Sequence, residues 1–299
     1  MRIAVTTPTG HIGRVVTRRL LDAGADVTLL VRNTEKVKAF IDRGATTFQG
    51  MLDDKNFVIE ATQGADALFW LTPLEFSSRD FRGHFNRMGQ AAAAAIRANS
   101  ISRLVHLSGA GAHLPSGPGP IPGLHDVERR LDDVVTHVTH LRPFFFFENF
   151  LLQIESIKNL GRVFLPVSGS TRIAMLATGD IGQAAASRLL DRTWTGRNVQ
   201  GLHGPADLSF DEAAGAIGRG LDRPVCHVRV PEKQARQAMR AAGLGEYLTE
   251  AFLEVFQAIE SGLLRPAEPR TAETTTPTTL EEFARDVLKP LVSEPAIAC

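Results

Sequence analysis

In the N-terminal half of the chain, short apolar runs alternate with segments whose apolar residues recur every three or four positions. A nearly continuous run such as Val27–Val31 is typical of a strand covered on both faces of a sheet. The spacing in His11–Ala23 predicts a helix with one apolar face, and Gly24 ends it. Strands are predicted over Arg2–Val5, Val27–Val31, Thr46–Gln49, Ala67–Pro73, Arg103–Gly109 and His137–Leu141. Helices are predicted over His11–Ala23, Thr34–Arg43, Asn56–Gln63, Phe81–Asn99 and Leu124–Val134. Such repeated strand–helix units predict a parallel, doubly wound sheet.

The C-terminal half follows no single pattern. Short strands are predicted around Gly161–Met175, and Pro266–Thr279 is a low-complexity segment typical of a loop. Helices are predicted over Asn149–Asn159, Asp180–Leu190, Ser209–Arg219, Thr249–Gly262 and Leu280–Leu288. We therefore expect an α/β protein: a Rossmann-type doubly wound parallel sheet over residues 1–145, with later returns near 180–204. A smaller, mainly C-terminal α+β lobe would occupy residues 146–299.

Composition narrows the classes of partner and compartment. The chain has 299 residues, and its 33 Lys and Arg balance its 33 Asp and Glu, so it lacks the basic surplus typical of proteins that bind nucleic acid or anionic membranes. We expect neither as a partner, and we expect no signal peptide. No apolar run reaches the roughly 20 residues that span a bilayer. Cys226 and Cys299 form no metal-ligand pattern, so we expect no bound metal and a reduced, cytoplasmic protein.

The stretch VTTPTGHIGRVV places Gly10 and Gly13 where a predicted strand gives way to a predicted helix. The first N–H groups of a helix have no partner within the helix and attract a pyrophosphate, and glycine lets the backbone approach it closely. A plain tight turn is the alternative. The context at the start of a strand–helix–strand unit favours a nucleotide site.

The residues after the second predicted strand, LLVRNTEK, favour NADP(H) over NAD. An acidic residue at this point would bind the ribose 2′-hydroxyl and repel a 2′-phosphate. The chain instead has Arg32, with Asn33 and Lys36 close by, and a guanidinium binds a phosphate through two donors. An ordinary surface arginine is the alternative.

Four motifs, TTPTGHIG, LLVRNTEK, FWLTP and LRPFFFFENF, resemble those of the NmrA-like group of atypical short-chain dehydrogenases/reductases. The resemblance extends to GPADLSFDEAA and TPTTLEEFARD near the C-terminal end. That group includes NADPH-dependent quinone and triphenylmethane-dye reductases, isoflavone-type reductases and NADP-binding regulators that catalyse nothing. The motifs therefore indicate family and cofactor more strongly than reaction.

The resemblance implies a set of cofactor-binding residues along the predicted strand ends. Thr7 stands where the family usually has glycine and can be tolerated if its φ is negative, and Met51 replaces an aspartate and would pack on the adenine. Phe144 and Phe145 would close over the nicotinamide. The full set is Thr7, Thr9, Gly10, His11, Ile12, Gly13, Arg32, Met51, Leu71, Thr72, Pro73, Ser108, Gly109, Phe144 and Phe145.

The proton donor of the usual mechanism is missing from its expected place. Most short-chain dehydrogenases pair a tyrosine with a lysine four residues later, but counting back from Glu128 places these positions at Pro120 and Leu124. We therefore do not expect the usual alcohol/ketone mechanism. His125, at the start of the predicted helix, is the candidate catalytic acid, because a histidine pKa suits proton transfer near neutrality. A histidine that faces solvent is the alternative.

Other polar residues nearby have plainer interpretations. We expect Asp126 and Glu128 to be charges at a helix start, stabilised by the helix dipole. His106 lies in a predicted buried strand and is expected to be a core histidine with a hydrogen-bond partner. His137 and His140 would point to opposite faces of a strand.

The stretch PFFFFENF predicts an apolar cleft, although core packing is the alternative for each ring. Its walls would be Phe144–Phe147, Phe150, Trp70 and Phe76, which would favour a flat, apolar substrate. Glu75, Asn149 and Ser108 would offer polar contacts. The residues predicted to bind substrate are Glu75, Phe76, Phe147 and Asn149.

The sequence therefore predicts an NADPH-dependent reductase that transfers hydride to a quinone, an enone or an aromatic polyketide-like compound. Such acceptors delocalise the added charge, so positioning matters more than a strong acid. Two alternatives stay open: an NADP(H)-binding regulator, or an enzyme that uses the same fold for a cyclisation or rearrangement without net redox change. A homodimer is left open as well.

Overall fold

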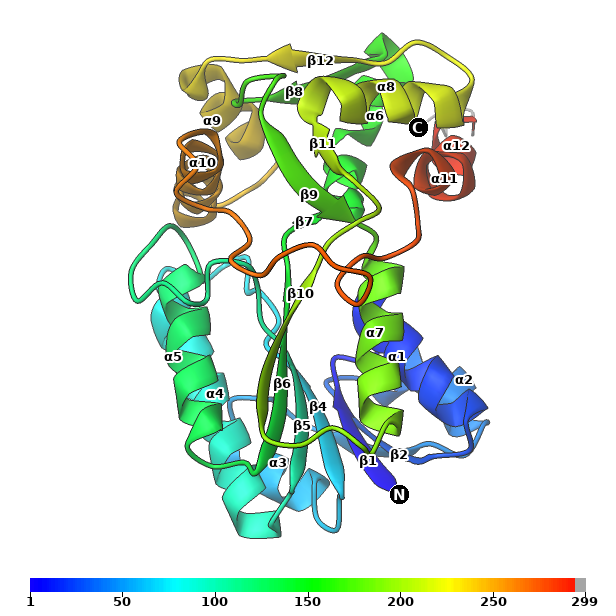
Figure 1. Cartoon of the computed structure of the whole chain (residues 1–299), viewed down its shortest axis with the longest axis vertical. Helices are drawn as coiled ribbons and strands as arrows, with labels where there is room; N and C mark the ends of the chain where they lie inside the picture. Colours follow the sequence, from blue (N-terminus) through cyan, green and yellow to red (C-terminus); the bar gives the residue numbers. More distant parts are fainter. Residues whose placement is uncertain (294–299) are drawn as a thin grey trace. The chain divides into compact units, whose positions relative to one another are not determined.

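The computed structural model describes residues 1–293, and these form two compact units (Figure 1). The first unit comprises Met1–Arg142 and Ile181–Gly201. The second comprises Pro143–Asp180 and residues 202–293 of the described chain. Both units are therefore assembled from stretches that are discontinuous in sequence.

The first unit contains a seven-stranded sheet with the order β10-β6-β5-β4-β1-β2-β3. Its strands are β1 (Arg2–Thr6), β2 (Asp26–Val31), β3 (Thr46–Gln49), β4 (Ala67–Leu71), β5 (Arg103–Leu107), β6 (His137–Pro143) and β10 (Arg197–Leu202). The neighbouring pairs from β3 through β6 are parallel. The order reverses between β1 and β4, and in sheets of this kind a ligand binds beside that reversal, at the carboxyl ends of the strands. The predicted Rossmann-type α/β fold is confirmed.

The helices of this unit cover both faces of the sheet. They are α1 (His11–Asp22), η1 (Thr34–Val37), α2 (Lys38–Ile41), α3 (Lys55–Ala61), α4 (Phe81–Asn99), α5 (Ile121–Asp132) and α7 (Thr178–Leu190). In Figure 1, α4 and α5 lie on one side of the sheet and α1 and α7 on the other. Five of the six residues of β2 are buried, as expected for a strand covered on both faces.

The α1 helix illustrates how local sequence produces these elements. Its buried positions include Ile12, Val16 and Leu20, which recur every four residues and form one apolar face. Gly24, with φ of +72°, follows its end in the left-handed conformation that glycine adopts without strain. These residues fix both the face that packs on the sheet and the end of the helix.

The second unit has two small sheets. β11 (Asp207–Ser209), β9 (Arg172–Leu176) and β7 (Phe145–Phe146) form one in that order, and β12 (Cys226–Arg229) pairs with β8 (Arg162–Leu165) in the other. Its helices are η2 (Phe147–Gln153), α6 (Ile154–Leu160), α8 (Phe210–Leu221), α9 (Glu232–Ala241), α10 (Glu246–Glu260), α11 (Leu280–Phe283), η3 (Ala284–Leu288) and α12 (Lys289–Ser293). Both parallel and antiparallel pairs occur, which agrees with an α+β lobe.

Four details of the second unit differ from the sequence prediction. The predicted helix Asn149–Asn159 is a 3-10 segment followed by the short α6, and the last helical segment continues beyond Leu288. The sequence pattern did not predict α9, because its apolar stripe is short and consists mainly of alanines in a strongly polar segment, with Ala235 its one buried residue. The predicted loop Pro266–Thr279 is irregular but contains a β-bridge between His203 and Thr275.

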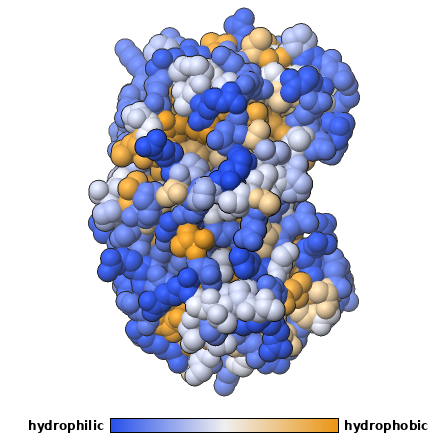
Figure 2. Space-filling model, viewed as in Figure 1, coloured by the Kyte–Doolittle hydropathy of each residue, from blue (hydrophilic) through white to orange (hydrophobic). Residues whose placement is uncertain are grey.

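The surface agrees with a balanced composition. Hydrophilic residues cover most of the face that Figure 2 shows. Within residues 1–293, none of the helices has the length and apolar character needed to cross a bilayer. No group of three or more potential metal ligands is found among those residues. Cys226 is a free, exposed thiol, and Cys299 lies outside the described residues.

Candidate functional site

The first unit brings many of the predicted cofactor residues to one edge of its sheet. The carboxyl ends of parallel strands share an edge, so the loops that follow them lie together. The residues at these ends are Thr7–Gly13 after β1, Arg32 after β2, Met51 after β3, Leu71–Pro73 at the end of β4, and Ser108 and Gly109 after β5.

The loop after β1 leaves the start of α1 free to bind an anion. Gly10 is the N-cap and offers no side chain, and the first turn of α1 contains no acidic residue. Within the described residues, the N–H groups of His11–Gly13 have no backbone acceptor. A Cβ atom on Gly13 would lie 2.1 Å from the carbonyl oxygen of Thr7, so only glycine fits there. Thr9, Gly10 and His11 are exposed, whereas Ile12 and Gly13 are buried. This arrangement fits a pyrophosphate.

Thr7 does not adopt the negative φ at which we expected a threonine to be tolerated. Its φ is +51°, in the left-handed region that a β-branched residue rarely adopts. The expectation of a negative φ is therefore wrong. A hydrogen bond from the Gly10 N–H to the Thr7 carbonyl (3.1 Å) closes the turn and holds this conformation. The buried Thr7 hydroxyl has no hydrogen-bond partner within the described chain.

The end of β2 presents an unopposed cation. Arg32 is exposed, and no ion pair to it is found among residues 1–293. The Gly50 N–H bonds the Val31 carbonyl (2.9 Å), which brings Met51 next to Arg32. The Met51 side chain is 49% exposed. An exposed thioether and an exposed guanidinium at neighbouring strand ends fit an adenine ring and its neighbouring 2′-phosphate.

Two hydrogen bonds fix the end of β4. The Leu71 N–H donates to the Thr6 hydroxyl at 2.9 Å, and the Trp70 indole donates to the Thr72 hydroxyl at 3.2 Å. Trp70 is fully buried, so its predicted place in a cleft wall is wrong; it is a core residue of the sheet. The sequence did not point to Thr6. Its hydroxyl bonds β4, a strand distant in sequence, and no local pattern around a threonine at a strand end predicts such a bond.

Leu124 is the residue that the count from Glu128 leads us to expect at the lysine position. It is buried, and its Cδ1 lies 3.1 Å from where a Cβ on Gly109 would be. An apolar side chain therefore packs against the turn after β5. Ser108, in the same turn, is 8% exposed.

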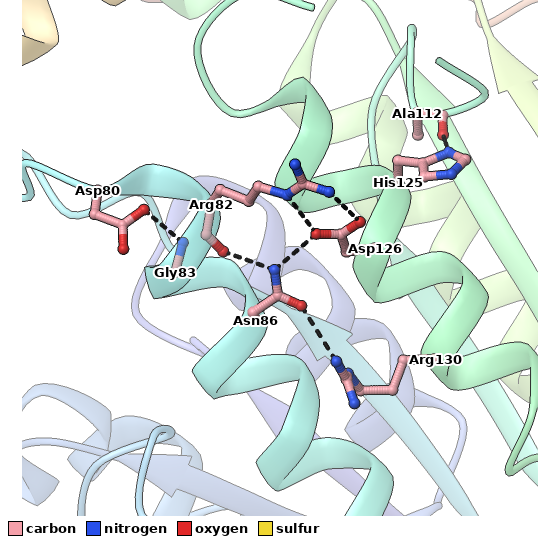
Figure 3. A network of polar contacts seen from close by, with 8 residues as sticks. All are labelled: Asp80, Arg82, Gly83, Asn86, Ala112, His125, Asp126 and Arg130. Atoms are coloured by element: carbon pink, nitrogen blue, oxygen red, sulfur yellow. Dashed lines mark hydrogen bonds and ion pairs between the residues drawn. The ribbon is translucent and has the colours of Figure 1, made fainter. Parts of the chain in front are cut away.

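His125 lies differently from its predicted place. α5 begins at Ile121, so His125 is in the second turn and not at the helix start. Its Nδ1 lies 2.9 Å from the Ala112 carbonyl (Figure 3). A carbonyl only accepts, so Nδ1 carries the hydrogen and Nε2 is the free acceptor in the neutral ring. The ring is therefore held by one nitrogen and half-buried.

Asp126 is not a charge at the helix start. It lies in the second turn of α5 and accepts two bonds from the Arg82 guanidinium, at 2.7 and 2.9 Å, and one from Asn86 at 2.8 Å (Figure 3). The bond from Arg82 lowers the pKa of Asp126 below its usual value. Asp126 therefore joins α5 to α4.

Glu128 is likewise not a helix-start charge, because it forms a buried ion pair across two elements. The Arg142 guanidinium, at the end of β6, donates to both of its oxygens, at 2.9 and 2.5 Å. Burial raises the pKa of Glu128, but the hydrogen bonds from Arg142 and the nearby positive charge outweigh it, and the net pKa is lowered. The Ser108 hydroxyl also lowers this pKa, although it makes no hydrogen bond of good geometry.

His106 is a core histidine, as predicted. It is 1% exposed, and its Nδ1 lies 2.9 Å from Nδ1 of His140, whose Nε2 lies 3.2 Å from Asp132. Burial lowers the pKa of His106 well below its usual value, so the ring is neutral. Donation from His106 to His140, and from His140 to Asp132, satisfies all three groups.

The remaining predicted residues divide between the units. Glu75 and Phe76 belong to the first unit and are exposed, with the Phe76 side chain 66% accessible. In the second unit, Asn149 is half-exposed, and no hydrogen bond to its side chain is found among residues 1–293. Free amide groups of this kind suit a polar substrate contact.

The phenylalanines of PFFFFENF are mostly core residues of the second unit. Phe145 packs edge-on against Phe150 and Phe210, with ring centroids 5.8 and 5.7 Å apart. Phe147 is fully buried, packs against Phe283 and forms part of the wall of a pocket of about 460 Å³ within this unit. Core packing is therefore the first role of Phe147. Phe144 is half-exposed.

The histidine of α4, His84, is a second residue that the sequence analysis missed. It is 4% exposed, and its two ring nitrogens face Pro73 and Glu75, at the carboxyl end of β4. No sequence motif pointed to His84. Its partners lie in the loop before the helix, and its contacts with them depend on the orientation of its ring in the folded chain.

Comparison with known proteins agrees with this architecture. An NAD(P)H azoreductase of Xenophilus azovorans is 29% identical over 255 residues, which cover 85% of this chain and 86% of that protein. The NADPH-dependent quinone oxidoreductase of Escherichia coli, solved with NADPH, superposes with a TM-score of 0.79 at 22% identity and covers 94% of this chain and 98% of its own. The triphenylmethane reductase of Citrobacter sp., solved with NADP(H), gives a TM-score of 0.78 at 20% identity, with coverage of 95% and 99%.

These structural matches have less than 25% identity and therefore establish the fold. The sequence model of the NmrA-like family matches residues 1–284 of this chain. The chain belongs to the NmrA-like family.

Proposed function

We propose that this protein is an NADPH-dependent reductase that transfers hydride to a flat, conjugated acceptor such as a quinone or an enone. One observation carries the choice of cofactor: Arg32 is exposed and unopposed at the end of β2, where an NAD-binding site would place an acidic residue. The relatives support the same class, because their names describe NAD(P)H azoreductase and NADPH-dependent quinone oxidoreductase activities.

The strand ends of the first unit would hold the cofactor. The free N–H groups at the start of α1 would bind the pyrophosphate, and Arg32 the 2′-phosphate. Met51 would cover the adenine, and Leu71–Pro73 with Ser108 would border the nicotinamide half. NADPH, when bound, supplies the hydride.

The acceptor class follows from what surrounds the turn after β5. Leu124 is apolar and buried there, and the nearby acid groups Asp126 and Glu128 are already bound by Arg82 and Arg142. His125 can donate from Nε2 only as an imidazolium, because Nδ1 is bound to the Ala112 carbonyl. A conjugated acceptor needs no strong acid as hydride arrives, since its charge spreads over the ring or enone.

A comparison of acceptors tests the proposal. With NADPH, we expect the protein to reduce quinones and conjugated enones, and to leave saturated ketones of similar size untouched. Reduction of saturated ketones at comparable kcat/KM would contradict it, because those acceptors need a proton donor at the developing alkoxide.

The alternative function, an NADP(H)-binding regulator, shares the same cofactor site. It would reveal itself by tight binding of NADPH with no consumption of it in the presence of any of these acceptors. The pairing of Asp126 with Arg82 and of Glu128 with Arg142 is compatible with that function as well.

A further inference from the structure

The segment that follows β4 is held in place residue by residue. The Thr6 hydroxyl accepts from the Leu71 N–H, and the Thr72 hydroxyl accepts from the Trp70 indole. The next polar group along the segment, the Pro73 carbonyl, lies 2.9 Å from Nε2 of His84. The carbonyl that precedes the exposed part of the loop is therefore anchored by a side chain of α4.

The His84 side chain has little freedom to move. Its backbone N–H bonds the Asp80 carbonyl in the first turn of α4, and its ring meets Phe85 edge-on with centroids 5.9 Å apart. The ring is 4% exposed, so it has little room to rotate. Because the Pro73 carbonyl only accepts, Nε2 carries a hydrogen and donates to it.

The second ring nitrogen points at Glu75. Nδ1 of His84 lies 3.3 Å from Oε2 of that carboxylate, and the Ser77 hydroxyl donates to its other oxygen at 3.3 Å. The Glu75 side chain is 52% exposed, so without these contacts it would be free to move in solvent. The neighbouring Phe76 ring is 66% exposed. Holding Glu75 therefore also fixes the part of the loop that presents Phe76.

We propose that His84 is a positioning residue with two separable tasks, which rests on the function proposed above. Through Nε2 it fixes the Pro73 carbonyl and with it the run Leu71–Pro73 along the cofactor. Through Nδ1, which donates to the Glu75 carboxylate when the ring is the doubly protonated imidazolium, it fixes Glu75 and the adjacent Phe76 for contact with the acceptor. The first task affects binding of NADPH, and the second affects KM for the acceptor.

The two ring nitrogens are separated by amide substitutions. The side-chain amide of glutamine reaches about as far as Nε2 and that of asparagine about as far as Nδ1. His84→Gln therefore keeps a donor for Pro73 and loses the contact with Glu75, whereas His84→Asn does the reverse. His84→Phe keeps a ring against Phe85 and loses both contacts. Met88→Leu, one turn further along α4 and also buried, is the matched control.

We expect a crossed pattern in the full-length protein. His84→Phe should weaken NADPH binding about fivefold and raise KM for a quinone by a similar factor, which is the usual effect of losing one hydrogen bond. His84→Gln should restore the Kd for NADPH to within about twofold and keep the raised KM. His84→Asn should keep the weakened Kd and lower the KM again, and Met88→Leu should change neither.

The Kd for NADPH, measured by titration without acceptor, separates failure of this proposal from failure of the proposed function. A protein that binds NADPH and reduces nothing contradicts the function, while the Kd values still test the Pro73 contact. Hydrogen exchange over residues 71–80 in the cofactor-free protein gives a third measurement. It should be faster in His84→Phe and slower again in His84→Gln. Equal behaviour of the Gln and Asn variants in all three measurements would overturn the proposal.

Discussion

At the scale of single residues, the two glycines of the loop after β1 do different work, although the sequence presents them as a pair. A side chain on Gly13 would collide with the backbone of Thr7, at 2.1 Å from its carbonyl oxygen. A Cβ on Gly10 would lie 3.6 Å from the same atom, which is an ordinary contact. Gly13 is thus required for packing between α1 and the loop, whereas Gly10 leaves space for a ligand.

Alanine at each position should separate folding from binding. Gly13→Ala should destabilise the protein by about 1–3 kcal/mol, because the methyl group must displace backbone. Gly10→Ala should leave the thermal midpoint nearly unchanged and weaken NADPH binding, because its methyl group would occupy the approach of the pyrophosphate. Thermal denaturation and cofactor titration of both variants check this, and unaltered NADPH affinity in Gly10→Ala would contradict the placement of the phosphates.

Arg32 should decide between the two nicotinamide cofactors. Removing it in Arg32→Ala should weaken NADPH binding by about tenfold to a hundredfold, as expected for hydrogen bonds to a charged phosphate, and leave NADH binding unchanged. Titration of both cofactors measures the ratio. Arg18→Ala, an exposed arginine on α1, is the control and should alter neither affinity. An equal loss of affinity for NADPH and NADH would contradict the proposal that Arg32 binds the 2′-phosphate.

At the scale of elements, the sequence predicted that α5 is a helix, but it did not predict where α5 begins or which charged residue it pairs with. The apolar period predicted the helix, but its start at Ile121 lay three residues before the expected one, within a proline- and glycine-rich stretch. The pairing of Glu128 with Arg142 joins a helix to a strand 14 residues later. Periodicity reports which face of an element is buried, but not which charged residue on another element will meet it.

The parts of the site that follow from local sequence patterns could be predicted, whereas the contacts between distant elements could not. The loop glycines, Arg32 and the strand ends follow from local patterns that repeat in one strand–helix unit. The left-handed φ of Thr7 and the contacts of His84 depend on atoms brought together only by the folded chain. Burial of Trp70 could not be told from exposure at a cleft, because both suit an aromatic residue at a strand end.

The buried pair on α5 should govern stability at low pH. Glu128 has a lowered pKa in the folded state, so its contribution to stability is fully present above the ordinary glutamate pKa of about 4.3 and is lost as the pH falls through the lowered value. Glu128→Gln should cost about 3–5 kcal/mol at neutral pH by leaving the Arg142 charge unpaired, with a smaller difference from the wild type in acid.

Free energies of unfolding measured from neutral pH down to about pH 3 check this, across the range in which carboxylates titrate. Glu60→Gln, an exposed residue of α3, is the control and should change stability by no more than about 0.5 kcal/mol. A Glu128→Gln variant as stable as the wild type at neutral pH would show that the ion pair contributes little.

At the scale of the whole molecule, the two units cannot be cut apart along the sequence. Their boundaries follow Arg142 and fall within α7 and β10, so each unit is completed by chain from both sides. The predicted cofactor residues lie mostly in the first unit, and Phe144, Phe145 and Asn149 lie in the second. Tests of function therefore require the full-length protein.

The central claim is that the protein consumes the NADPH it binds. The most direct test mixes the purified full-length protein, loaded with one equivalent of NADPH, with a quinone such as menadione under anaerobic conditions, and follows the nicotinamide absorbance. We expect loss of one NADPH for each quinone reduced to hydroquinone, at a rate well above that of the mixture without protein. Tight binding of NADPH that stays unoxidised with menadione and with conjugated enones would contradict it.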